Sequence, residues 1–119
     1  MLRYHSWPSP YVCVTSILIV GFVTILGFSP QVLYHEYIPS SISQPIKQFR
    51  TSHDILCVRL AACVWIIHVS ESLLATVIAK NKGLHPSSCS TWGLSTLIIG
   101  FPSLISLMNL DVKAIKKKL

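Results

Sequence analysis

Three long apolar runs, separated by polar stretches, dominate the pattern of hydrophobic positions along this chain. The first run, Tyr11–Phe28, carries no charge, and the second, Ile55–Ala79, is the longest of the three. The third run, Trp92–Leu110, is uncharged and contains Pro102, which is expected to kink a helix. Each run is close to or above the length of about 20 apolar residues that a helix needs to cross a bilayer core. The pattern therefore predicts an all-α integral membrane protein with three transmembrane helices.

The polar segments complete a single membrane domain over residues 1–119. Pro30, Pro39 and Pro45 lie in the linker 29–54, where turn residues at this density are expected to break any long helix. The first run could also be a cleaved signal peptide, but it exceeds the usual apolar core of one and no small-x-small cleavage site follows. We therefore expect spans at about 11–28, 55–79 and 92–110, followed by a basic tail, 111–119.

The composition supports a membrane protein and excludes a nucleic-acid-binding face. Hydrophobic residues make up 51% of the chain and charged residues only 12%, whereas a soluble domain carries about 25% charged residues. Three of the ten Lys and Arg residues lie in the last four positions and most of the others flank the apolar runs, so they do not gather on one surface and no nucleic acid partner is expected. Cys13, Cys57 and Cys63 lie inside apolar runs, where cysteine behaves as a small hydrophobe, so no disulfide framework is predicted.

The distribution of basic residues predicts an orientation. With three spans, the N-terminus and the loop 80–91 share one side, which carries Arg3, Lys80 and Lys82. The opposite side carries six basic residues, Lys47, Arg50, Lys113, Lys116, Lys117 and Lys118. Because Lys and Arg concentrate on the cytosolic side, this arrangement favours a cytosolic linker and C-terminus and an extracytoplasmic N-terminus.

The last residues, Lys116-Lys117-Lys118-Leu119, suggest a location. Lysines at the third and fourth positions from a cytosolic C-terminus resemble the dilysine signal that retrieves membrane proteins to the endoplasmic reticulum. A signal of this kind is an address read by a receptor. The alternative is that the lysines stop translocation and contact anionic lipid. The sequence thus predicts an integral membrane protein of the endoplasmic reticulum, with Lys116 and Lys117 as a candidate retrieval signal.

One side of the second run is polar. At 100° per residue His68 and Glu71 fall on this side, and their spacing of three lets the two side chains meet. Small residues there permit close approach of another helix, and the third run has a matching surface with a small-xxx-small spacing. The expected helix-packing face consists of Ala61, Ser72, Ala75, Gly93, Thr96, Gly100 and Ser103. Packing these surfaces together would hide His68 and Glu71 from lipid.

Three interpretations of the intramembrane polar pair, His68 and Glu71, stay open. The pair could fix helix packing, which is the favoured interpretation, contact a polar group of a lipid or partner helix, or carry out proton transfer, metal binding or catalysis. The other two runs supply no His, Asp or Glu to complete a metal site. The chain also lacks a nucleophile elbow, a Gly-rich phosphate loop and a His-Glu-x-x-His motif. We therefore expect no catalytic residue, no metal and no cofactor.

Two segments resemble a known family. Trp65–Leu73, with its His-x-x-Glu-Ser-Leu element, followed by Lys80–Gly83, resembles the core motif of the transmembrane protein 254 family. Trp92-x-Leu94-x-Thr96, followed by Gly100 and Ser103-Leu104, resembles the last span of that family. The resemblance extends from His53 to Leu110. It implies a small three-span membrane protein and carries over no catalytic residues.

The sequence favours a non-enzymatic function. We expect a small scaffold or accessory subunit that engages membrane lipids and either a membrane-protein partner or further copies of itself. One alternative is a subunit of a membrane lipid-modifying enzyme that uses His68 and Glu71. A second alternative is an ion or proton conduit, which would need oligomers because three helices are too few to enclose a pore.

Overall fold

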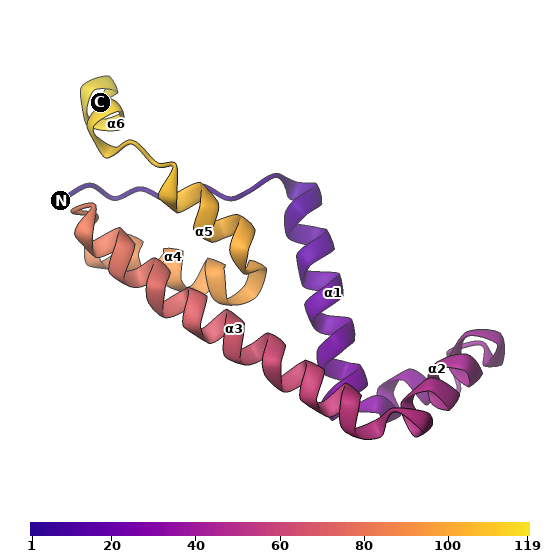
Figure 1. Cartoon of the computed structure of the whole chain (residues 1–119). Coiled ribbons are helices and arrows are strands. Elements are labelled where there is room, and N and C mark those ends of the chain that lie inside the picture. Colours follow the sequence, from indigo (N-terminus) through magenta and orange to yellow (C-terminus); the bar gives the residue numbers. More distant parts are fainter. The chain divides into compact units, whose positions relative to one another are not determined.

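The computed structural model describes all residues, 1–119, and its regular secondary structure is helical (Figure 1). The elements in chain order are α1 (Pro10–Phe28), η1 (Pro30–Tyr34), α2 (Ser40–Ser52), α3 (Asp54–Asn81), α4 (Pro86–Ile99), α5 (Phe101–Met108) and α6 (Val112–Lys118). The chain forms two compact units. The first unit consists of Met1–Ile17 and Ile67–Leu119, and the second consists of Leu18–Ile66.

Two helices, α1 and α3, are long and apolar enough to cross a membrane. They coincide with the first two predicted spans, and the 28 residues of α3 correspond to about 42 Å of helix. Asp54 in the first turn of α3 complements the positive end of the helix dipole. After α3 the chain turns at Gly83, whose φ is 72°. The bonds Leu84 N to Ala79 O and Gly83 N to Lys80 O form the Schellman pattern that terminates a helix.

Over residues 92–110, the third predicted span, the structure does not have the single kinked helix that the sequence predicts. The structure has two helices there, α4 and α5, which meet at Gly100 and pack against each other (Figure 1). Gly100 has φ 81° and ψ −143°, a conformation open almost only to glycine. Pro102 lies in the first turn of α5, where a missing N–H costs no hydrogen bond, so it starts a second helix instead of kinking the first.

Buried hydroxyl groups join α4 to α5. Ser95 Oγ lies 2.9 Å from Ser103 Oγ, and Thr96 Oγ1 donates to Ser103 Oγ at 3.3 Å. All three side chains are fully buried or nearly so. Around them an apolar core of the first unit unites α3, α4 and α5 through Ala75, Ala79, Leu84, Cys89, Trp92, Leu104 and Leu107. The polar groups of the hairpin therefore satisfy one another inside the protein, as buried polar groups must.

The extended N-terminal segment lies along the first unit beside the start of α4. Leu2 and Leu84 form an isolated parallel β-bridge, and His85 N donates to Leu2 O at 2.8 Å. Tyr4 continues the contact, because its N–H donates to Ser88 Oγ at 2.9 Å and its carbonyl accepts from Trp92 Nε1 at 3.1 Å. These bonds attach the N-terminus to the end of the first unit where α3 stops and α4 begins.

In the second unit, the end of α1 packs closely against the first turns of α3. A methyl group added at Gly27 would lie 2.3 Å from Ala61 Cβ and 2.9 Å from Cys57 O, so only glycine permits this approach. Trp65 Nε1 donates to Thr24 Oγ1 at 2.8 Å. The linker contains the 13-residue helix α2 with Pro45 inside it, where the sequence had predicted turns that exclude a long helix.

Candidate functional site

The predicted polar pair lies where α3 meets the tip of the α4–α5 hairpin. His68 Nδ1 is 2.8 Å from Leu97 O, in the last turn of α4. The His68 ring and the Glu71 carboxylate both approach Gly100: a methyl group built there would lie 2.9 Å from His68 Cε1 and 3.4 Å from Glu71 Oε2. The two side chains therefore converge on the glycine at which the chain reverses.

The bond from His68 identifies a structural task for the imidazole. The carbonyls in the last turn of a helix lack partners within the helix, and a carbonyl oxygen can only accept. Nδ1 therefore carries the proton and donates to Leu97 O. Gly100 N donates to Thr96 O at 2.7 Å, so the interrupted end of α4 is capped by backbone and side chain together.

Small and hydroxyl side chains bring α3 and α4 together beside this cluster. Ser72 Oγ donates to Gly93 O at 2.7 Å, and a methyl group at Gly93 would lie 2.5 Å from Thr76 Oγ1. Most of the residues expected to form the packing face lie in the first unit: Ser72, Ala75, Gly93, Thr96, Gly100 and Ser103. Ala61 differs, because it lies in the second unit against Gly27 of α1.

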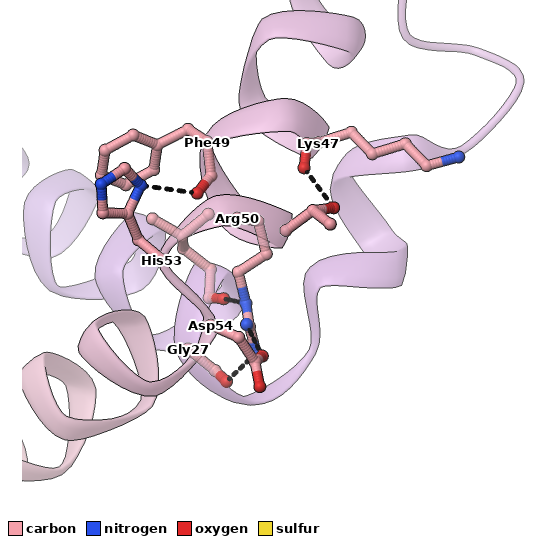
Figure 2. A network of polar contacts seen from close by, with 8 residues as sticks. Gly27, Lys47, Phe49, Arg50, His53 and Asp54 are labelled. Carbon is pink, nitrogen blue, oxygen red and sulfur yellow. Dashed lines mark hydrogen bonds and ion pairs between the residues drawn. The ribbon is translucent and has the colours of Figure 1, made fainter.

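A second polar cluster, which the sequence did not predict, lies around Arg50 in the second unit, and Figure 2 shows its contacts. Arg50 of α2 is buried, and its Nε donates to Leu26 O at 2.7 Å while Nη2 donates to Gly27 O at 3.2 Å. Its Nη1 forms an ion pair with Asp54, four residues on. Arg50 thus caps the last turn of α1, which has no basic residue of its own. The Arg-x-x-x-Asp spacing was a signal for the ion pair, but nothing in the sequence pointed to α1.

Lys82, directly after α3, also caps the C-terminal end of another helix. Its Nζ donates to Met108 O at 2.9 Å and to Leu110 O at 2.7 Å, which are carbonyls at and just beyond the end of α5. Three cationic or imidazole side chains, Arg50, His68 and Lys82, therefore cap the C-terminal ends of α1, α4 and α5 respectively. The arrangement suits the negative end of each helix dipole.

The N-terminal segment contributes an aromatic contact to the first unit. The His5 ring packs against Trp7 and Trp92, with ring centroids 4.9 and 4.5 Å apart, and its Nε2 is 3.0 Å from Ser95 Oγ. Burial lowers the pKa of His5 below its usual 6.5, which favours the neutral ring among these partners. The four cysteines are free, and no group of three or more His, Cys, Asp or Glu side chains is close enough to hold a metal ion.

The structure is all-α, and two of its helices are long and apolar enough to cross a membrane, as in small helical membrane proteins. The family model described as Transmembrane protein 254 matches residues 10–109, and the chain belongs to that family. It is 34% identical over 92 residues to "Transmembrane protein 254" of Pongo abelii and to that of Homo sapiens, with 74% of this chain and 72% of each relative covered. No solved structure matches the chain.

Proposed function

We propose that this chain is a non-enzymatic scaffold or accessory subunit that engages partner helices or lipids in the membrane. The observation that carries the proposal is the use of the polar side of α3 within the chain itself. His68 and Ser72, the donors on that side, each bind a backbone carbonyl of α4. Side chains occupied in holding the hairpin are poorly suited to bind a substrate, whereas they are well suited to fix a rigid surface.

The surfaces that α1 and α3 leave open are mostly apolar, although Arg59 and Ser70 of α3 are also exposed. In the first unit, α3 exposes Ile67, Val69, Leu73, Leu74 and Val77. In the second unit, α1 and α3 expose Leu18, Ile19, Phe22, Ile55 and Leu60. Within a bilayer such faces contact lipid tails, the helices of another protein or the helices of a second copy of this chain. Lipids and a membrane-protein partner or homo-oligomer are therefore the proposed ligands.

Purification in mild detergent tests this function. We expect mass spectrometry to detect a stoichiometric membrane-protein partner, and cross-linking in intact membranes to reproduce the same pair. A matched variant, Leu73→Ser on the exposed face of α3, is expected to reduce the partner's recovery while Lys118→Ser in the tail leaves it unchanged. Recovery of the chain as a monomer with a retained lipid that reaches His68 would instead support the lipid-modifying alternative.

Variants of the polar pair provide a second test, which distinguishes a structural role of these side chains from a role in a reaction. Glu71→Gln keeps the shape of the side chain and removes a charge that is costly at membrane depth, so we expect normal expression and detergent stability. His68→Leu leaves Leu97 O without its donor and is expected to lower stability by about 1–3 kcal/mol. The double variant His68→Leu/Glu71→Leu should recover part of the loss if the two sites are coupled. A stable Glu71→Gln protein that cannot rescue a deletion phenotype would contradict the packing function and place the carboxylate in a reaction.

We also propose residence in the endoplasmic reticulum with a cytosolic C-terminus. The exposed lysines of the tail support this location. Replacing Lys116 and Lys117 with serine is expected to move the protein to later secretory membranes, which fluorescence microscopy with compartment markers would measure. The control variant Lys113→Ser/Lys118→Ser removes the same charge but leaves the dilysine pair, so it should stay in place. Equal behaviour of the two variants would rule out retrieval by this signal.

A further inference from the structure

The path of the chain after α3 has a consequence for its membrane topology. We propose that the α4–α5 hairpin is re-entrant, so that it enters and leaves the membrane through one face. The chain then crosses the bilayer twice, through α1 and α3, and both termini lie on the same, cytosolic face. This topology replaces the three-span path and reverses the predicted side of the N-terminus, while the C-terminus stays cytosolic.

The length of α4 and α5 is the first argument for a re-entrant hairpin. α4 has 14 residues and α5 has 8, which correspond to about 21 Å and about 12 Å of helix. Neither helix can cross a hydrocarbon core about 30 Å thick. A continuous kinked helix over the whole range could cross, but the chain reverses at Gly100 and the hydroxyls of Ser95 and Ser103 hold the two helices together.

The second step is the position at which α5 ends. Lys82, directly after the last residue of α3, donates to Met108 O and Leu110 O. The exit of the hairpin is therefore beside its entrance. In a three-span path, Leu110 would lie on the far side of the membrane from Lys82, about 30 Å away, and these bonds could not form.

The third step concerns the depth of the hairpin tip. Gly100 lies against His68, which is about 20 Å along α3 from Asn81, the last residue of that helix. Irregular backbone at membrane depth is tolerated only where protein or water satisfies it. Here Leu97 O accepts from His68, Gly100 N donates to Thr96 O, and Ser103 N donates to Gly100 O at 3.1 Å. The broken backbone is thus satisfied within the protein.

The N-terminus lies at the same end of the first unit. Its bridge to Leu84 and the bond from Tyr4 N to Ser88 Oγ join it to the loop between α3 and α4. One membrane face then carries seven of the ten basic residues, Arg3, Lys80, Lys82, Lys113, Lys116, Lys117 and Lys118. The linker face carries Lys47 and Arg50. This bias is stronger than that of the three-span path, and it makes the face with both termini cytosolic.

Cross-linking of cysteine pairs in native membranes tests the path of the hairpin. In a full-length variant without its own four cysteines, Asn81→Cys/Val112→Cys joins two residues that line the same pocket beside Lys82. In the comparison variant Thr51→Cys/Val112→Cys, the two thiols lie on the same membrane face only if the chain crosses the membrane three times. We expect a short bifunctional maleimide to cross-link the first pair within one chain and not the second. Reaction of the second pair, or failure of the first, overturns the proposal.

Glycosylation tests independently on which side of the membrane the linker and the two termini lie. The chain has no Asn-x-Ser/Thr acceptor, and Ser41→Asn creates one in the linker because Ser43 follows two residues later. Acceptor tags on the N-terminus and on the C-terminus provide the other two reporters. Expressed in cells, only the Ser41→Asn protein is expected to gain a glycan, seen as an endoglycosidase-sensitive mass shift. A glycan on either terminal tag, or its absence from the linker variant, contradicts the assigned sides.

Discussion

Replacing Gly100 with alanine is expected to lower the stability of the first unit by about 1–3 kcal/mol from backbone strain alone. Its φ of 81° lies where side chains are disfavoured, and the added methyl group would lie 2.9 Å from His68 Cε1. The ring would have to move, which would also weaken its bond to Leu97 O. The midpoint of thermal unfolding in mild detergent would measure the loss, together with the fraction of monodisperse protein.

Gly21→Ala is the matched control for this prediction. Gly21 lies within α1, where a methyl group would meet no atom within 4 Å. Alanine favours the helix over glycine by about 1 kcal/mol, so this variant should be as stable as the parent or slightly more stable. Equal midpoints for Gly100→Ala and Gly21→Ala would contradict the reversal of the chain at Gly100. A continuous helix over this range would accept alanine at both positions.

Replacing Arg50 with methionine is expected to destabilise the second unit by about 1.5–3 kcal/mol, the usual range for hydrogen bonds to a charged group. Methionine fills a similar volume but leaves Leu26 O and Gly27 O without their donors. Arg50→Lys should fall between methionine and the parent, because a single ammonium cannot reproduce the planar fork of the guanidinium. Hydrogen exchange at the end of α1 and the unfolding midpoint would measure these effects.

Lys47→Met provides the control for Arg50. Lys47 lies about one turn earlier in α2, and its exposed side chain is near the Tyr34 ring, with Nζ 5.9 Å from the ring centroid. Removing this charge should change stability by no more than about 0.5 kcal/mol. The two variants alter net charge equally, so a loss confined to Arg50→Met would assign the effect to the cap on α1. Equal losses would contradict that role.

The two long apolar helices, α1 and α3, and the polar side of α3 followed from sequence. Apolar runs as long as Tyr11–Phe28 and Ile55–Ala79 leave few alternatives to a helix. Periodicity also placed His68, Ser72 and Ala75 on one side of α3, and the structure has all three in the first unit beside α4. A helical period is a local property, so the residues alone determined these features.

The reversal at Gly100 was not predicted, although its signals are present. A glycine that can terminate a helix is followed two residues later by a proline that suits the first turn of another. The same residues occur in a kinked span, and hydrophobicity is equal for both paths. Tertiary contacts decide between them, because the Ser95, Thr96 and Ser103 hydroxyls bond to one another only when the two helices are antiparallel neighbours.

The caps on the helix ends likewise depend on tertiary structure. The sequence indicates Arg50 and Lys82 only as charges that set orientation, since each binds carbonyls of a helix that is distant in the chain. Composition and periodicity determined that this chain is an all-α membrane protein and which side of α3 is polar. Only the folded chain decided which carbonyls its cationic side chains and His68 bind, because those bonds join helix ends that no local pattern relates.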